Sequence, residues 1–226
     1  MPSSIPRSAW TRLRPRLASL RLAPVQSVSW GHPSTTGYPT IDYFLTSEAM
    51  EPPDGADHYT ERLVRLPNLS IYYEPAIVDP APIERPEFGL RPDACMFWCG
   101  QSISKYLPRH DEVFPLIAKE APHNQFLLID FGALGRTSSE RFQRRLQRAF
   151  AAHGLDSSKH CAFCGRLNSA RFSALLHFSD VYLDSIGWSG VNTTLEGLQH
   201  DLPIITIAAP LMRGRHTLGI LREMGV

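Results

Sequence analysis

The chain has 226 residues, which is room for one large domain or about one and a half domains of ordinary size. Apolar residues make up 43% and charged residues 20% of the chain, so a sizeable core can form and wholesale disorder is excluded. The 23 basic and 22 acidic residues nearly cancel, and no apolar run reaches the ~18 residues of a membrane-spanning helix. We therefore expect a globular, cytoplasmic protein whose partners include neither nucleic acid nor a membrane.

The start of the chain is basic. Its first 41 residues contain no acid and five arginines: Arg7, Arg12, Arg14, Arg16 and Arg21. Such a start is typical of an organellar transit peptide, and the alternative is a surface arm. Pro6, Pro15 and Pro24 interrupt an amphipathic helix, which favours the arm. We expect residues 1–22 to form a basic N-terminal arm.

Short apolar segments follow the arm. They occupy residues 25–30, 41–46 and 63–66, and a turn-rich stretch at residues 31–39 separates the first two. Five prolines between residues 75 and 92 then indicate a stiff linker or a surface loop. The sequence therefore places a domain boundary near residue 90.

Beyond residue 93 the pattern is regular. Strand-length apolar runs occupy residues 94–99, 125–130, 160–163, 181–184 and 203–207. Segments with helical spacing occupy residues 111–120, 138–153, 169–178, 192–200 and 215–224. Strands and helices that alternate in this way predict an α/β fold with a parallel sheet covered on both faces.

Two features of this region have a structural interpretation. The 138–153 helix carries an apolar stripe and, opposite it, a face that we expect to be solvated; the four arginines of that face are Arg141, Arg144, Arg145 and Arg148. The four cysteines form two pairs, Cys95/Cys99 and Cys161/Cys164, which is compatible with a zinc site. Because both pairs lie in or beside apolar runs, free buried thiols are favoured, and no metal or other cofactor is expected.

Ligands of open α/β sheets bind at the carboxyl ends of the strands, so the loops there are the candidate site. After the first strand, Gln101 offers an amide and Lys105 an ammonium group. After the fourth strand, two glycines precede Asn192, Thr193 and Thr194, with Asn192 as the expected N-cap. Backbone N–H groups and hydroxyls at a helix N-terminus form an anion site.

Three further side chains extend this site. Glu196, in the expected first turn of the helix, has a carboxylate that can accept hydrogen bonds from the two hydroxyls of a ribose. Phe172 can stack on a base, and Arg215 lies near the same edge of the sheet. Taken together the loops indicate a nucleoside diphosphate as ligand. Each residue by itself also has a purely structural interpretation: Lys105 as a surface lysine, Asn192 and Glu196 as helix-capping residues, and Phe172 as a core aromatic. Neither the dinucleotide fingerprint nor the P-loop is present.

These residues make the sequence similar to a known family. The segments concerned are residues 101–108 (QSISKYLP), 180–184 (DVYLD), 189–196 (SGVNTTLE), 202–206 (LPIIT) and 213–216 (RGRH), with 23–26 (APVQ), 30–33 (WGHP), 41–43 (IDY) and 59–63 (YTERL) upstream. In this order they resemble the catalytic region of O-linked N-acetylglucosamine transferases, particularly bacterial relatives that carry tetratricopeptide repeats upstream.

The resemblance implies a glycosyltransferase type B fold of two Rossmann-like domains, apparently truncated here. Residues 91–226 would form most of the second, nucleotide-sugar-binding domain, and residues 23–90 a remnant of the first catalytic domain with the Pro-rich linker. The implied reaction moves N-acetylglucosamine from UDP to Ser or Thr hydroxyls of proteins without a metal. Its partners would be a UDP-sugar, a protein acceptor and a repeat-containing partner or missing upstream segment.

The resemblance also implies roles for the site residues. Gln101 and Lys105 would hold the diphosphate, and the catalytic role of Lys105 would be to neutralise charge on the leaving UDP. Thr193 and Thr194 would bind the same diphosphate, and Glu196 would hold the ribose. Two other interpretations remain open: the same scaffold with UDP-glucose or GDP-fucose as donor, and a non-catalytic remnant that binds nucleotide or a partner.

Overall fold

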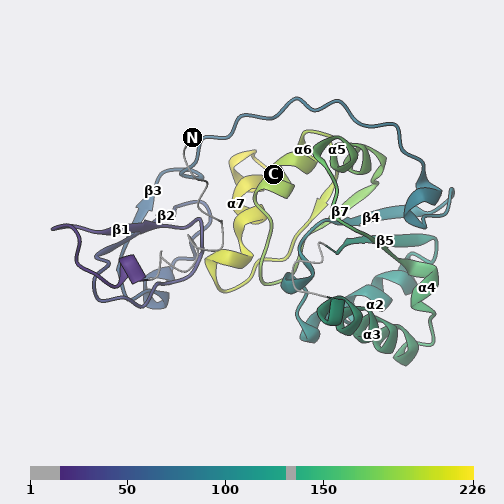
Figure 1. Cartoon of the computed structure of the whole chain (residues 1–226), viewed down its shortest axis with the longest axis horizontal. Coiled ribbons are helices and arrows are strands. Elements are labelled where there is room, and N and C mark those ends of the chain that lie inside the picture. Colours follow the sequence, from purple (N-terminus) through teal and green to yellow (C-terminus); the bar gives the residue numbers. More distant parts are fainter. Residues whose placement is uncertain (1–15, 131–135) are drawn as a thin grey trace, which may run out of the picture. The chain divides into compact units, whose positions relative to one another are not determined.

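The computed structural model describes residues 16–130 and 136–226 and divides into two units (Figure 1). The first unit contains the chain up to Tyr72 together with Pro210–Arg213 and Gly219–Val226. The second unit contains Tyr73–Ala209 and Gly214–Leu218. The domain bounds expected from the sequence, residues 23–90 and 91–226, stay a prediction. No helix in the described part of the chain is both long enough and apolar enough to cross a membrane.

The first unit is built on a three-stranded parallel sheet. Its strands are β1 (Ser27–Ser29), β2 (Tyr43–Ser47) and β3 (Arg62–Leu66), in the order β1-β2-β3. Each of the three short apolar segments of this region thus contributes one strand. Phe44 on the central strand is fully buried, and its ring centroid lies 4.4 Å from that of Tyr59.

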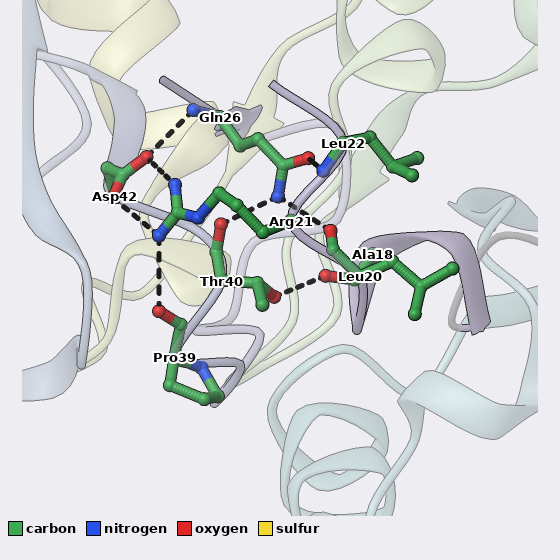
Figure 2. Close-up of polar contacts among 8 residues, drawn as sticks. All are labelled: Ala18, Leu20, Arg21, Leu22, Gln26, Pro39, Thr40 and Asp42. Carbon is green, nitrogen blue, oxygen red and sulfur yellow. Dashed lines mark hydrogen bonds and ion pairs between the residues drawn. The ribbon is translucent and has the colours of Figure 1, made fainter. Parts of the chain in front are cut away.

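A polar cluster in the first unit ties residues 18–26 to residues 39–42 (Figure 2). The Arg21 guanidinium donates to both carboxylate oxygens of Asp42, at 2.5 and 3.0 Å. The Gln26 backbone N–H donates to the same carboxylate at 2.8 Å, and the Gln26 side chain donates to the Thr40 carbonyl at 2.7 Å. Hydrogen bonding to Arg21 and Gln26 holds the pKa of Asp42 below its usual value.

Arg21, at the end of the expected basic arm, is thus fixed in an exposed ion pair. Arg7, Arg12 and Arg14 of that arm lie outside the described residues.

The second unit is built on a five-stranded parallel sheet. Its strand order is β6-β5-β4-β7-β8, with β4 at Cys95–Cys99, β5 at Asn124–Ile129, β6 at Cys161–Cys164, β7 at Val181–Leu183 and β8 at Ile204–Ile205. All five predicted strands are present, and every pairing is parallel. The last strand is shorter than the predicted 203–207 because the three-residue β7 offers it only two register pairs, Tyr182↔Ile204 and Leu183↔Ile205.

Helices cover both faces of this sheet (Figure 1). They are α2 (Val113–Glu120), α3 (Arg136–Ala152), α4 (Ser157–His160), α5 (Ser169–Phe178) and α6 (Asn192–Leu198). The last helix, α7 (His216–Glu223), is divided between the two units, with the residues from Gly219 onward in the first. The strand period of two divides the core: Met96 and Trp98 of β4 pack with the α5 side, and Phe97 and Cys99 pack with α2 and α3. The predicted parallel α/β architecture is therefore confirmed.

The arginine face of α3 is not entirely solvated. Arg145 donates to both carboxylate oxygens of Asp111, at 2.9 and 2.6 Å, and to the Tyr106 carbonyl at 2.8 Å. The prediction of a solvated face is wrong for this residue because the connection between β4 and α2 supplies two acceptors to its guanidinium, the buried Asp111 carboxylate and the Tyr106 carbonyl. Arg141, Arg144 and Arg148 are exposed as predicted.

The Pro-rich segment contributes to the core of the second unit. Ile83, Phe88 and Leu90 are buried there, and the Ala81 N–H donates to the Ala170 carbonyl at 3.0 Å. Apolar side chains at intervals among the prolines thus anchor the segment on the α5 face of the sheet.

The cysteines are free thiols. Cys99 and Cys164 are buried, whereas Cys95 and Cys161 are half-buried. Burial raises the pKa of Cys164 to about 11, so this thiol is protonated at neutral pH. In residues 16–130 and 136–226, no three His, Cys, Asp or Glu side chains lie close enough together to hold a metal ion.

Candidate functional site

A cavity of about 390 Å³ opens in the second unit between α5 and the start of α6. Parallel βα connections place the N-termini of these helices at the carboxyl edge of the sheet, where ligands of such folds bind. Four of the eight predicted site residues line it: Phe172, Asn192, Thr193 and Glu196. The tertiary structure therefore brings half of the predicted site together around one cavity.

Phe172 is fixed by its surroundings. Its ring meets the buried Trp98 ring edge-on, with centroids 5.2 Å apart and an interplanar angle of 81°. Helix α5 begins at the N-cap Asn168, whose side chain accepts a hydrogen bond from the Arg171 N–H at 2.9 Å. A half-buried aromatic ring held in this way lines the cavity and can provide an apolar surface for a planar ligand.

Lys105 lies in a short 3₁₀ turn, Ile103–Lys105, after β4. Its ammonium donates to Gln101 Oε1 at 2.8 Å and to the Ser189 carbonyl at 3.1 Å, so it connects the loop after β4 with the loop after β7. Burial lowers the pKa of Lys105 below the usual value of a lysine, and the charge of Asp184 opposes this shift. A desolvated cation without a salt bridge in the described residues would gain a strong partner from an anionic ligand.

Gln101 links Lys105 to the cavity. Its side chain is buried, and its Nε2 donates to the Tyr182 hydroxyl at 2.6 Å and to the Thr193 hydroxyl. The hydroxyl oxygens of Tyr182 and Thr193 lie 2.9 Å apart. We call these four residues, Lys105, Gln101, Tyr182 and Thr193, the Gln101 network. The Gln101 side-chain amide makes its hydrogen bonds within the network. Thr193 is the member of the network that lines the cavity.

The sequence did not single out Tyr182, although it lies within the predicted strand. A tyrosine inside an apolar run is indistinguishable from any other core aromatic until its hydroxyl has a partner.

Asp184 holds the loop of residues 185–191 in place. One carboxylate oxygen accepts from the backbone N–H groups of Ser185 and Gly190, both at 2.9 Å, and the other accepts from the Thr206 hydroxyl at 2.9 Å. Burial raises the pKa of Asp184, and these hydrogen bonds counteract the rise. This residue was also missed as part of the site; its position directly after a predicted strand was the signal available.

The start of α6 differs from the prediction. Val191 is the N-cap, whereas Asn192 is the first helical residue and is exposed, without the expected side-chain cap. Because the helix starts at Asn192, Glu196 lies beyond the first turn rather than within it. Glu196 is half-buried at the cavity, and burial raises the pKa of its carboxyl.

The two predicted threonines point to different surroundings. Thr193 lines the cavity, whereas Thr194 is fully buried and its hydroxyl lies 2.9 Å from the Thr217 hydroxyl. Successive helical residues are rotated by about 100°, which turns Thr194 away from the cavity and toward Thr217. The Thr194 side chain therefore fixes the helix start from within the protein.

Other residues at the cavity were not predicted. Ser173 and His200 line it, and the Ser173 hydroxyl lies 3.2 Å from His200 Nε2. Burial lowers the pKa of His200. Helical periodicity alone would have assigned Ser173 to the buried face of α5. The sequence therefore contained no signal that Ser173 lies at the site.

The two basic residues near the end of the chain lie apart from the cavity lining. Arg215 is half-buried and donates to the Ala209 carbonyl at 3.3 Å. His216 is buried, and its Nδ1 lies 3.4 Å from the Ser189 carbonyl that also accepts from Lys105. Burial lowers the pKa of His216 to about 4, so this imidazole is neutral at neutral pH.

Comparison with known proteins adds an independent observation. No protein-family profile matches the chain. It is 28% identical over 211 residues to SPINDLY of Solanum lycopersicum and 27% identical over 208 residues to SEC of Arabidopsis thaliana, which are both named as probable UDP-N-acetylglucosamine–peptide N-acetylglucosaminyltransferases. These matches cover 91% and 89% of the chain. The structure of an O-GlcNAc transferase of Thermobaculum terrenum matches 90% of the chain with a TM-score of 0.71 and 29% identity.

In sequence and in structure the chain is similar to the O-linked N-acetylglucosamine transferases.

The match to this family extends over most of the described structure and confirms the predicted glycosyltransferase type B fold. It covers 22% of the tomato relative, 20% of SEC and 37% of the Thermobaculum transferase. The chain thus spans about a fifth of the length of the curated relatives it matches.

Proposed function

We propose that this chain carries the donor-binding part of a glycosyltransferase that moves N-acetylglucosamine from UDP to Ser or Thr hydroxyls of proteins. The observation that supports it best is the cavity at the carboxyl edge of the second sheet, with an aromatic ring, a carboxylate and the Thr193 hydroxyl on its walls. The names of the related plant and bacterial proteins favour the same chemistry. A protein acceptor, a repeat-containing partner and a cytoplasmic location belong to this proposal.

The proposed pose follows the chemistry of the cavity walls. The base stacks on Phe172, the ribose hydroxyls donate to Glu196, and the diphosphate accepts hydrogen bonds from Thr193 beside Asn192. The acceptor hydroxyl oxygen forms a bond to the anomeric carbon, the bond from that carbon to the UDP oxygen breaks, and the proton of the hydroxyl passes to water. Lys105 stabilises the negative charge that develops on the leaving UDP, while Gln101 holds Lys105 toward the loop after β7.

Two predicted residues have a less direct part in the proposed site. Thr194 acts by fixing the start of α6 through Thr217. Arg215 adds positive charge near the same edge of the sheet, where its guanidinium supports the adjoining loop through the Ala209 carbonyl.

Binding of UDP measured by calorimetry tests the donor site. We expect the wild-type chain to bind UDP, and Lys105→Ala to weaken binding by about tenfold or more, because a charge-assisted hydrogen bond contributes about 1.5–3 kcal/mol. Lys119→Ala is the matched control, since Lys119 is exposed on α2 and does not line the cavity. A wild-type chain that binds no UDP contradicts the donor-site proposal, and equal binding by both variants contradicts the role of Lys105.

A second measurement concerns the donor and the reaction. The same titration with GDP distinguishes a uridine-specific cavity from one that accepts GDP-sugars, and tighter binding of GDP would replace UDP in the proposal. Incubation with UDP-N-acetylglucosamine and a Ser/Thr peptide, followed by mass spectrometry of the peptide, reports sugar transfer. UDP binding without transfer would identify a nucleotide-binding module rather than a complete enzyme.

A further inference from the structure

Tyr182 lies at the centre of the Gln101 network. Its side chain is fully buried on β7, and its hydroxyl contacts Gln101 Nε2 at 2.6 Å and the Thr193 hydroxyl at 2.9 Å. Burial, with the nearby charge of Asp184, raises the pKa of Tyr182, so the hydroxyl keeps its proton at neutral pH. A buried phenol within a polar network has to place that proton on an acceptor.

The Lys105 ammonium sets the direction of the hydrogen bonds. An ammonium only donates, so the Gln101 atom that faces Lys105 at 2.8 Å is the carbonyl oxygen Oε1. The Gln101 nitrogen Nε2 therefore faces the two hydroxyls and donates one hydrogen to Tyr182 and one to Thr193. Both hydroxyl oxygens act as acceptors in these bonds, and each still has its own hydrogen to donate.

Two directions are possible for the hydrogen bond between the two hydroxyls. If Thr193 donates to Tyr182, the Tyr182 hydrogen goes to the neighbouring Thr194 hydroxyl, and Thr193 has no hydrogen left for the cavity. If Tyr182 donates to Thr193, the Thr193 hydrogen is directed outward, and Thr193 lines the cavity. A phosphate oxygen only accepts hydrogen bonds, so a nucleotide bound in the cavity favours the second arrangement.

We propose that Tyr182 is a positioning residue that turns the Thr193 hydroxyl into a dedicated donor for a phosphate oxygen of the bound nucleotide. This inference rests on the proposed function and adds to it a residue that the nucleotide does not touch. Each donor from Lys105 through Gln101 and Tyr182 to Thr193 is polarised in the same direction, which strengthens the final hydrogen bond.

The glycine at position 190 supports a network of fixed geometry. A Cβ atom placed on Gly190 would lie 2.6 Å from the Thr193 hydroxyl oxygen and 2.8 Å from the Tyr182 hydroxyl oxygen, and it would also collide with Gln101 Nε2. The backbone of the loop after β7 therefore packs directly on the three polar groups. Such close packing limits their rotation and preserves the direction of the hydrogen bonds.

Tyr182→Phe tests the inference because it removes the hydroxyl and keeps the ring. We expect UDP to bind about three- to tenfold more weakly, the effect of one lost hydrogen bond, while uridine without phosphate binds with unchanged affinity. A merely structural defect would weaken both ligands. Tyr59→Phe is the matched control, since it removes a hydroxyl that contacts the buried Glu51 of the first unit; we expect it to leave both affinities unchanged.

Thr193→Val supplies a second test that keeps Tyr182 in place. It should weaken UDP binding and spare uridine, and adding Tyr182→Phe to it should cause no further loss, because the hydroxyl that Tyr182 directs is already absent. The inference is overturned if wild type and Tyr182→Phe bind UDP with equal affinity, or if the losses of the two single variants add up in the double variant. Either result leaves the proposed function standing. A wild-type chain that binds no UDP overturns the proposed function and the inference together.

Discussion

Lys105 is the residue on which the proposed chemistry depends most. It is one of only three lysines in the chain, and it is the one that contacts both the loop after β4 and the loop after β7. Its position after a strand and four residues from Gln101 was sufficient to predict a role at the sheet edge. Its half-buried state was not predictable, because burial is produced by the loop of residues 185–191 and not by its neighbours in sequence.

The lowered pKa of Lys105 makes the UDP affinity sensitive to alkaline pH. The charge that attracts phosphate is present below the pKa of Lys105 in the folded chain and is lost as the pH rises through that value, which lies below that of an ordinary lysine. We expect the affinity ratio between wild type and Lys105→Ala to fall toward one on the alkaline side, which calorimetry at several pH values would measure. A ratio that stays constant across this range would show that the Lys105 charge does not contribute to binding.

At the scale of elements, helix α3 is held to the sheet by more than its apolar stripe. Phe142, Leu146 and Phe150 are buried as the helical period predicts, but Arg145 also pairs with the nearly buried Asp111. This pair could not be predicted from the sequence, since Arg145 has three arginine neighbours on the same face and Asp111 lies 34 residues away. The two ends of the loop after β4 are thus fixed by different means, one by the Gln101 network and the other by this ion pair.

We expect Arg145→Ala to lower the free energy of unfolding by about 2–4 kcal/mol, because it leaves Asp111 with little solvent and no guanidinium partner. Arg141→Ala removes an exposed arginine of the same helix and should change stability by less than about 0.5 kcal/mol. Urea denaturation of the two variants and the wild type gives both values. Equal stabilities of the two variants would mean that the ion pair does not anchor α3.

At the scale of the molecule, the residues of the candidate site belong to the second unit. This unit contains the five-stranded sheet, both of its core clusters and the cavity. The first unit has its own sheet and its own polar cluster around Arg21 and Asp42. Nucleotide binding is therefore expected to act on one unit and to leave the other unaltered.

Hydrogen exchange with and without UDP tests this expectation. At about 100 times its Kd, UDP should raise the free energy of unfolding of the second unit by about 2.7 kcal/mol, because it binds only the folded state. Exchange should slow most in residues 185–196, around the cavity, and should be unchanged in residues 23–66. Protection confined to the first unit would contradict the location of the proposed site.

The sequence by itself determined the order of strands and helices, the parallel α/β class and the loops that contribute to the candidate site. These features depend on hydrophobic periodicity and on glycine, threonine and lysine at strand ends, which are local properties of the chain. Only the tertiary structure decided which side chains meet. Tyr182 and Gln101 are 81 residues apart, and Thr193 and Gln101 are 92 residues apart.

The tertiary structure likewise decided that Thr193 faces the cavity whereas Thr194 faces Thr217. The direction of a hydroxyl depends on the exact residue at which a helix begins and on partners brought in by other elements, and neither is recorded in local sequence.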